Sequence, residues 1–347
     1  MTVDWKNTNR TDIWKVEMVD PINLESSRGY LTDIEEINLT YGYYTETRSG
    51  ATVKTLGDGG YIENSQLRII HEVSEWGYQE VLFTGFVTGK SPIWYQGECE
   101  VTYTLSSDLY GLKVDLHRTD FTCGAGSTAI GSASLLMGYC SRPHKLITGY
   151  TDYIFSTAKV FTIGENLLST VSELCDLANC RYSVDGYGYV TIRAYVSPSH
   201  KTPSVVLDEN DPKSMLIQNQ IQETSNESEL PGEVLVTSGS GDTKISGWAM
   251  VPSGSILHPS RRGYNYVELQ EVSELNPNTA EAAALKAKTL LQNDTVIREW
   301  SVDSLYFPTR DGDVFRYIGA GGDRNVLLKS VDINCMQGTQ KMTLKEV

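Results

Sequence analysis

The sequence predicts an α+β protein that is predominantly β, and three observations lead to this fold class. Apolar and polar residues alternate repeatedly along the first third of the chain. Tyrosine dominates the aromatic residues, with 20 Tyr against 7 Phe and 6 Trp, and it suits half-buried strands because its ring packs while its hydroxyl stays hydrated. Two later segments carry apolar residues at helical spacing, which adds helices to the strands.

Residues 1–118 are predicted to contain several short strands, because apolar residues at every second position place one face of a strand in a core and the other in water. The alternating residues are Trp14, Val16 and Met18; Ile37, Leu39, Tyr41 and Tyr43; Cys99, Val101, Tyr103 and Leu105; and Leu112, Val114 and Leu116. Turn-forming residues lie between them, at Gly57-Asp58-Gly59-Gly60, Gly85, Gly89 and Ser91-Pro92. This pattern predicts an antiparallel barrel or sandwich.

Residues 119–210 are predicted to form a smaller α+β domain. A segment of small residues favours a helix at about 127–138, and a second helix is predicted at about 165–179. The apolar stripe of the second helix is Leu167, Leu168, Val171, Leu174, Cys175 and Ala178. A hairpin over 181–195 follows, with the turn Asp185-Gly186-Tyr187-Gly188. The polar residues 199–229 are predicted to be a long surface connection.

Residues 211–347 return to strand patterning, from 233–237 onward. A helix is predicted at about 279–292, where Asn278 and Glu281 form a capping box after Pro277. Its buried face is Ala283, Ala284, Ala287, Leu290 and Leu291. Further strands run from 296–300, through the turn at 310–313, to 342–345.

The net charge of −15, from 44 acidic and 29 basic residues, disfavours sequence-specific binding of nucleic acid. It is explained by solubility, or by a conduit wall that DNA slides past without being gripped. No apolar run is long enough to span a membrane, and the N-terminus lacks the pattern of a secretion signal. We therefore expect synthesis in a cytosol, and six free, buried cysteines: Cys99, Cys123, Cys140, Cys175, Cys180 and Cys335.

We predict no catalytic residue, no metal ligand and no cofactor site. The histidines form no spaced pair; they are His71, His117, His144, His200 and His258, and the alternation places His117 on an outer face. The run from Gly124 to Ala129 lacks the lysine of a phosphate loop, so it is interpreted as a helix start.

Three alternatives for a binding or catalytic site remain open. Calcium could bind the acidic turns at 208–211 and 311–313, although ordinary turn chemistry explains them. Two carboxylates could act as a glycosidase pair, but this requires a particular distance between the two groups, which the sequence does not show. Sugars could stack on aromatic rings that strand packing explains equally well: Tyr41, Tyr43, Tyr44, Tyr187 and Tyr189.

The stretch 153–195 resembles a passage in minor tail proteins of long-tailed phages, the tail-associated or baseplate hub proteins. The resemblance is carried by Phe161-Thr162-Ile163-Gly164-Glu165-Asn166-Leu167-Leu168, and by the later Val184-Asp185-Gly186-Tyr187-Gly188. The opening Trp14-Lys15-Val16-Glu17-Met18, the segment 230–236 and the late helix before residues 310–314 occur in the same order. One departure is Pro231-Gly232, where such proteins commonly carry Pro-Asn.

The resemblance implies two antiparallel β-barrel domains, at 1–118 and 211–347, joined by smaller helix-plus-hairpin units. It implies a homotrimer at the tail tip of the virion, with the barrels forming a pseudo-sixfold ring that leaves a DNA passage. The expected partners are the tail tube or distal tail protein, the central fibre or spike, and the tape-measure protein. No enzyme activity, specific DNA binding or stable membrane insertion is expected.

Two other classes of function compete with this hypothesis. The first is a receptor- or glycan-binding tail protein, in one form wall-degrading, which needs clustered carboxylates beside a groove lined by aromatic residues. The second is an unrelated cytosolic β-rich binding protein. Oligomeric state and glycan affinity discriminate between them.

Overall fold

The structure is a computed structural model that describes residues 5–6, 10–43, 45, 47–140, 143–147, 149–211, 213–217, 221–225, 230–239, 244–272, 275, 279–294, 298–310, 312–319 and 322–347. Strands take 48% of the residues and helices 16%, which confirms a predominantly β protein. None of the helices in the described part of the chain has the length and apolarity that crossing a membrane requires. The chain divides into two compact units, Met1–Gln220 with Val302–Thr343, and Ile221–Ser301 with Leu344–Val347.

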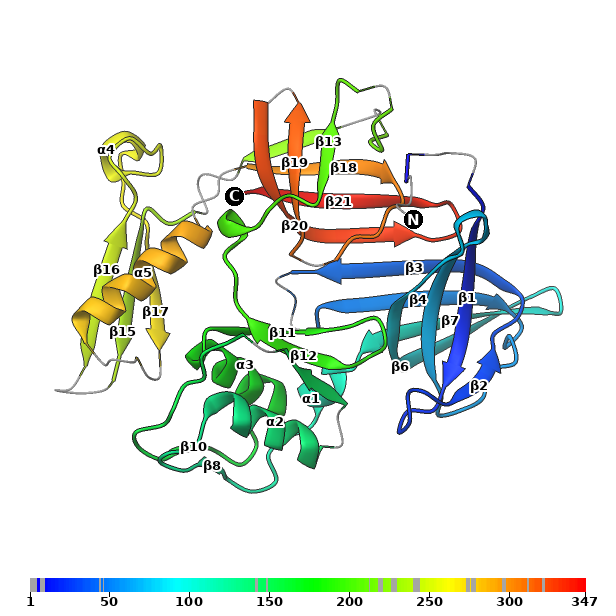
Figure 1. Cartoon of the computed structure of the whole chain (residues 1–347), viewed down its shortest axis with the longest axis horizontal. Helices are drawn as coiled ribbons and strands as arrows, with labels where there is room; N and C mark the ends of the chain where they lie inside the picture. Colours follow the sequence, from blue (N-terminus) through cyan, green and yellow to red (C-terminus); the bar gives the residue numbers. More distant parts are fainter. Residues whose placement is uncertain are drawn as a thin grey trace. The chain divides into compact units, whose positions relative to one another are not determined.

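The first unit is built on a large, mainly antiparallel sheet (Figure 1). Its neighbouring strands are, in order, β21 (Thr339–Glu346), β20 (Gly322–Asn334), β3 (Ile34–Gly42), β4 (Ser49–Leu56), β7 (Glu98–Ser107), β6 (Tyr78–Tyr95), β5 (Gln66–Val73), β1 (Asp12–Val19) and β2 (Ser27–Tyr30). At one end, β13 (Val205–Asp208) runs parallel to β19 (Val314–Gly319), which is antiparallel to β20. The pairing of β20 with β3 joins the C-terminal strands to the N-terminal ones.

The alternating residues of the sequence form the core of this sheet. Val16, Ile37, Leu39 and Tyr103 are completely buried, as alternation predicts. The hydrogen-bonded neighbours among the described strands form one open series. The division into two closed barrels therefore stays a prediction, as does the three-domain division.

Helices cover a second core within the same unit. The elements are α1 (Leu109–Val114), β8 (Phe121–Cys123), α2 (Ala129–Tyr139), β9 (His144–Leu146), β10 (Lys159–Phe161), α3 (Leu167–Leu177), β11 (Cys180–Val184), β12 (Val190–Ala194), and the 3₁₀ turns η1 (Ser74–Trp76) and η2 (Pro198–His200). All six residues of the predicted stripe on α3 are buried, and Thr128 caps α2 by accepting a hydrogen bond from Gly131 N. Both helices and the hairpin β11–β12 are confirmed.

The predicted strand at Leu112–Leu116 is wrong, because this segment begins with helix α1. Leu109 and Leu112 are fully buried at helical spacing, whereas Val114 and Leu116 are exposed. The assignment of His117 to an outer face of that strand is therefore also wrong. His117 is buried beside the rings of Phe121 and Phe161, and its Nε2 lies 2.8 Å from Thr170 Oγ1.

Two further predictions about connections are wrong. The region 199–229 is not only a surface connection, because it contains β13 and β14 (Gln222–Ser225), and Leu207 on β13 is fully buried. The turns expected at Gly85, Gly89 and Ser91-Pro92 are absent, since β6 runs through all of these residues. Gly85 instead allows close packing, because a Cβ there would lie 2.4 Å from the carbonyl oxygen of Ser106.

The second unit is a three-stranded sheet covered on one face by a helix (Figure 1). Its elements are β15 (Glu233–Ser238), β16 (Ile245–Met250), β17 (Val267–Val272), α4 (Pro259–Arg262), α5 (Ala280–Asp294), β14 and the first half of β18 (Arg298–Leu305). Helix α5 confirms the predicted helix, with Ala283, Ala287 and Leu291 buried against β15 and β16. Asn278, Pro277, Val296 and Ile297 lie outside the described residues.

Candidate assembly surface

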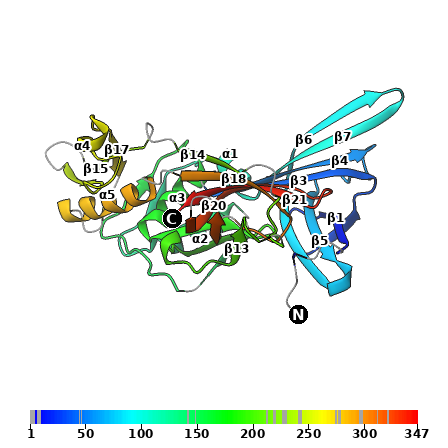
Figure 2. The same cartoon turned by 90° about the horizontal axis from the view of Figure 1, so that it is seen from above.

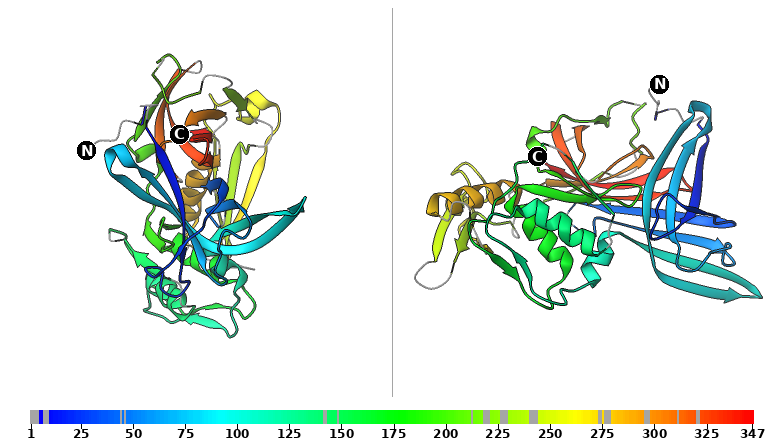
Figure 3. Two further views of the ribbon diagram at one scale, coloured as in Figure 1. Left: turned by 90° about the vertical axis from the view of Figure 1, so that its right-hand side faces the viewer. Right: turned by 60° about the horizontal axis from the view of Figure 1, so that its bottom comes forward.

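The feature of the first unit most suited to binding another protein is the hairpin of β6 and β7, called here the arm. Strand β6 has 18 residues; Tyr78–Phe86 pair with β5, but the remainder pairs only with β7 among the described strands. Figures 2 and 3 show its tip extending beyond the neighbouring strands. The turn is a two-residue loop in which Gln96 and Gly97 both have positive φ, as a tight hairpin of this length requires.

The tip of the arm exposes three large apolar side chains. Ile93 is 58% exposed, Trp94 73% and Tyr95 71%. Trp94 lies directly across from Cys99, and Pro92 across from Val101. Because directly opposed residues share a face, Trp94 continues the face on which Val101 and Tyr103 are buried. The core of the sheet thus extends as an apolar stripe onto a projecting hairpin.

The outer edge of the arm carries residues that oppose uncontrolled strand pairing. Lys90 and Pro92 lie on this edge, and natural proteins use both residue types to keep edge strands from aggregating. The Lys90 ammonium lies 5.8 Å from the ring centre of Tyr61 and 5.7 Å from that of Tyr103. The arm is therefore equipped to bind through the side chains at its tip, more than through its backbone.

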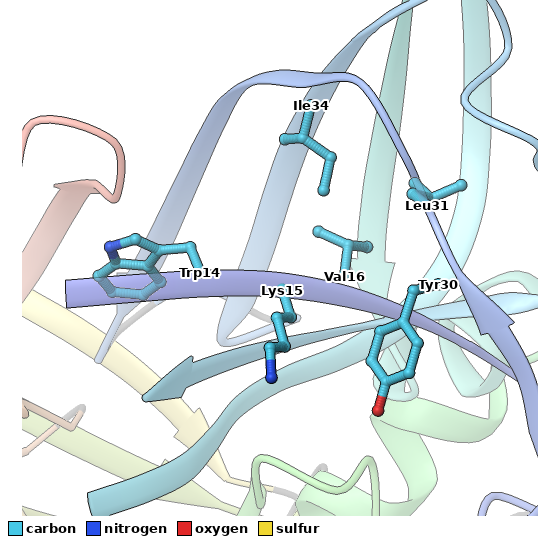
Figure 4. A pocket seen from close by; sticks show the side chains of 6 residues that line it. All are labelled: Trp14, Lys15, Val16, Tyr30, Leu31 and Ile34. Atoms are coloured by element: carbon cyan, nitrogen blue, oxygen red, sulfur yellow. The ribbon is translucent and has the colours of Figure 1, made fainter. Parts of the chain in front are cut away.

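A pocket of about 350 Å³ lies beside β1 in the same unit (Figure 4). Its lining residues are Trp14, Lys15, Val16, Tyr30, Leu31 and Ile34. The Lys15 ammonium lies 2.7 Å from the Glu72 carboxylate, and its side chain remains 44% exposed. These lining residues include no carboxylate, whereas a glycosidase cleft needs two.

Sequence reasoning did not identify the buried cluster around His71. His71 is fully buried, and its Nε2 lies 2.8 Å from Asp12 Oδ1, while Arg10 Nε donates to Asp12 Oδ2 at 2.9 Å. The rings of Trp14 and Tyr306 pack against the imidazole, with centroids 4.3 and 4.9 Å away. Burial raises the pKa of the Asp12 carboxyl, but the hydrogen bonds from His71 and Arg10 outweigh it, so this pKa lies below its ordinary value.

Two of the three remaining histidines make local side-chain contacts. His144 Nε2 lies 2.7 Å from Ser134 Oγ, and His258 Nδ1 accepts the backbone N–H of Ser260 at the start of α4. His200 is exposed in η2. Each of these contacts is structural in kind.

The acidic turns use their carboxylates for turn chemistry. Asp208 accepts the N–H of Asn210, Asp211 that of Lys213, and Asp313 that of Arg310. Asp311 lies outside the described residues. Among the residues that the structure describes, no three His, Cys, Asp or Glu side chains gather as a metal site would require. None of the six cysteines takes part in a disulfide, and the expectation of burial is wrong for Cys99 and Cys140, which are only half-buried.

The tyrosines considered as sugar platforms are engaged within the chain. The Arg181 guanidinium lies 3.4 Å from the ring centre of Tyr43, and the Lys145 ammonium 3.6 Å from that of Tyr189. Tyr41 donates its hydroxyl to the carbonyl of Leu82 at 2.8 Å. Tyr187 keeps half of its surface exposed beside Arg68, and Tyr44 lies outside the described residues. These contacts support the packing interpretation.

Several solved structures have a fold similar to that of this chain. The chain is similar to the tail protein from Neisseria meningitidis MC58, with a TM-score of 0.72 and 12% identity over 96% of both chains. It is similar to the 43 kDa tail protein of prophage MuSo2 from Shewanella oneidensis, with a TM-score of 0.67 and 12% identity over 96% of this chain and 98% of that one.

A third similar structure is the E. coli c3393 protein, a component of the type VI secretion system that resembles the T4 bacteriophage tail proteins gp27 and gp5. Its TM-score is 0.50, with 10% identity over 91% of this chain and 74% of that one. No family model and no curated protein sequence matches the chain. At these identities the likeness concerns the fold, and the chain has the fold of phage tail and baseplate proteins along nearly its whole length.

Proposed function

We propose that the chain is a structural hub of a phage tail tip and works as a homotrimer. Three copies, each with two barrel-like halves, form a pseudo-sixfold ring that continues the hexameric tail tube. The same ring presents threefold symmetry to a central fibre or spike. This role is geometric: the hub adapts one symmetry to another and leaves a passage for DNA, and it is not an enzyme.

The observation that carries the proposal is the exposed arm. A long hairpin that exposes Ile93, Trp94 and Tyr95 is an aggregation hazard on a protein that works alone. In a closed ring, the same side chains are covered by a neighbour, and interface cores are enriched in Trp and Tyr. Similarity to tail proteins over 96% of the chain supports this use of the whole fold.

The charge of the chain fits a DNA passage. A net charge of −15 repels the phosphate backbone, so a ring of such chains lets DNA move through without specific binding. The proposed neighbours are the tail tube or distal tail protein, the fibre or spike, and the tape-measure protein. The proposed location is the tail tip of the virion.

Mass and shape measurements test the proposal. Light scattering of the purified chain, alone and with the tube protein of the same gene cluster, is expected to give a trimer, and electron microscopy a closed ring. A tape-measure gene just upstream and a fibre gene downstream are expected. A chain that stays monomeric with its tube protein and binds glycans measurably contradicts the proposal and supports a receptor-binding or wall-degrading tail protein.

A further inference from the structure

We propose that the hairpin of β11 and β12 is a latch that holds the helical core of the first unit in one orientation on the large sheet. The helical core is defined here as the elements from α1 to β12, residues 109–194. All contacts of the latch lie within one chain and are independent of the proposed assembly. The latch gives a role to the turn Asp185-Gly186-Tyr187-Gly188, to which the hub hypothesis assigns none.

The helical core has an interior of its own. Among the described residues, its buried apolar cluster consists of side chains between Leu109 and Ile192, and no residue of the large sheet belongs to it. The described strands of the helical core pair only with one another, β8 with β10, and β12 with β11 and β9. A segment with its own core can keep its fold when its orientation changes. The contacts between the helical core and the sheet therefore decide how the two are oriented.

The turn of the hairpin fits closely against β6. Gly186 leaves no room for a side chain, because a Cβ there would lie 1.8 Å from the carbonyl oxygen of Val81. Thr84 donates its hydroxyl to the carbonyl of Gly186 at 2.7 Å. Gly188 has a φ of +91°, and a Cβ there would lie 3.3 Å from the Cβ of Thr84. The two glycines thus let the backbone of the turn approach the backbone of the strand.

The tyrosine of the turn adds a contact with an arginine that is fixed in the sheet. The Arg68 guanidinium lies 5.4 Å from the ring centre of Tyr187, which attracts it as a cation–π pair. Arg68 pairs with Glu17 at 3.2 Å, and its Nε donates to Thr84 Oγ1 at 3.1 Å. Because Thr84 Oγ1 accepts this hydrogen bond, its own hydrogen is directed to the carbonyl of Gly186. Arg68 therefore orders both contacts of the turn.

The base of the hairpin is held at a second place. The Arg181 side chain, which covers the ring of Tyr43, also donates from Nη2 to the carbonyl of Tyr43 at 3.2 Å. The Arg48 guanidinium lies 5.0 Å from the ring centre of Tyr182. Tyr43 directly follows β3 and Arg48 directly precedes β4, whereas the turn rests on β6. Figure 1 shows the hairpin between α3 and these strands. One contact would leave a pivot, but two separated contacts fix the orientation.

Distance measurements by electron spin resonance test the latch in the full-length chain. One spin label replaces Leu135 on α2 and the other replaces Leu56 at the end of β4, and both positions are exposed. The labels are attached to non-canonical amino acids, so that the six free cysteines stay unmodified. We expect one narrow distribution of distances for the wild type. Gly186→Ala should broaden it, because the added Cβ forces the turn away from Val81 and leaves the helical core to pivot on its base.

Matched variants isolate the effect of the latch. Neither Gly186 nor Gly124 has a positive φ, so alanine strains neither backbone. A Cβ at Gly124, in the same helical core, meets nothing within 4 Å, so Gly124→Ala should keep the distribution narrow. Tyr187→Ala removes a half-exposed ring from the latch and should broaden the distribution less than Gly186→Ala. Tyr139→Ala removes an exposed ring of α2 outside the latch and should not broaden it.

Hydrogen–deuterium exchange shows whether the two cores stay folded. In Gly186→Ala, amides of residues 185–189 should exchange about tenfold faster, while peptides from α3 and β5 keep their wild-type rates. A distribution that stays narrow in Gly186→Ala overturns the inference, and so does a broad one in the wild type. Faster exchange of α3 also overturns it, because the turn and the helical core would then unfold together. None of these results bears on trimer formation, so the proposed function is tested separately.

Discussion

Replacing Asp12 by Asn should destabilise the sheet of the first unit at neutral pH. Asp12 accepts hydrogen bonds from Arg10 and His71, and the side chains of these three residues are 17%, 6% and 0% exposed. Removal of the carboxylate leaves the Arg10 guanidinium buried without its countercharge. Breaking a buried pair in this way costs about 3–5 kcal/mol, and a hydrogen bond retained by the Asn carbonyl reduces the loss. We expect the free energy of unfolding to fall by about 3 kcal/mol.

The effect should depend on pH in a defined direction. The pKa of Asp12 in the folded chain is lowered from 3.8, so the folded state favours the ionised carboxylate. The resulting stability is complete above the pKa of the unfolded chain and is lost as pH falls through the lower folded value. The difference between wild type and Asp12→Asn should therefore be constant from pH 7 to about 5 and shrink below about pH 4.

Hydrogen–deuterium exchange of peptides from β1 and β5, combined with urea unfolding, measures this local effect. Exchange is informative here because the chain divides into two compact units, and peptides from β1 and β5 report on the first of them. Asp323→Asn is the matched control, since Asp323 also pairs with an arginine, Arg316, but both side chains are half exposed. A difference below about 1 kcal/mol at pH 7, or one that does not change down to pH 3, refutes the reasoning.

Three further outcomes follow from packing. Gly247→Leu should loosen α5 and lower the stability of the second unit by about 3 kcal/mol, because even a Cβ at Gly247 would lie 2.2 Å from the backbone nitrogen of Ala284. A thermal melt measures the loss. Gly254→Leu is the control and should be neutral, because a Cβ at Gly254 meets nothing within 4 Å. Leu174→Ala on α3 should lower the free energy of unfolding in urea by about 3 kcal/mol, because Leu174 is fully buried. Leu135 on α2 is half exposed, so Leu135→Ala should cost far less. Equal effects would contradict the assigned core. Burial raises the pKa of the Cys175 thiol, so this cysteine should react with a thiol reagent only on unfolding. Fast labelling of Cys175 itself in native protein, read by peptide mapping, would show that its core is misassigned.

Local patterns were sufficient for several elements. The stripe of α3 and the small-residue start of α2 are encoded in adjacent residues, and a helix buries residues at a fixed spacing whatever it packs against. The hairpin β11–β12 is equally local, because its turn residues bring the two strands together.

The segment after β7 shows where local patterns fail. Leu112, Val114 and Leu116 alternate like a strand, yet α1 forms because Leu109 and Leu112 pack into the helical core. His117 is buried by Phe121 and Phe161, and Phe161 lies more than 40 residues away in the sequence. Alternation shows which residues are apolar, but whether they are buried depends on which residues from other parts of the chain pack against them.

The sequence by itself determined the class of this protein: a β-rich chain with two amphipathic helices, a strong negative charge and an order of motifs like that of phage tail hubs. Only the tertiary structure showed the arm, because Gly85, Gly89 and Pro92 resemble turn residues until the neighbouring strands are in place. The exposure of Trp94 likewise depends on where β5 begins, because β6 has no β5 partner beyond Phe86. Periodicity is a property of adjacent residues, whereas an open edge, a pocket or a buried ion pair depends on distances between residues that are remote in sequence.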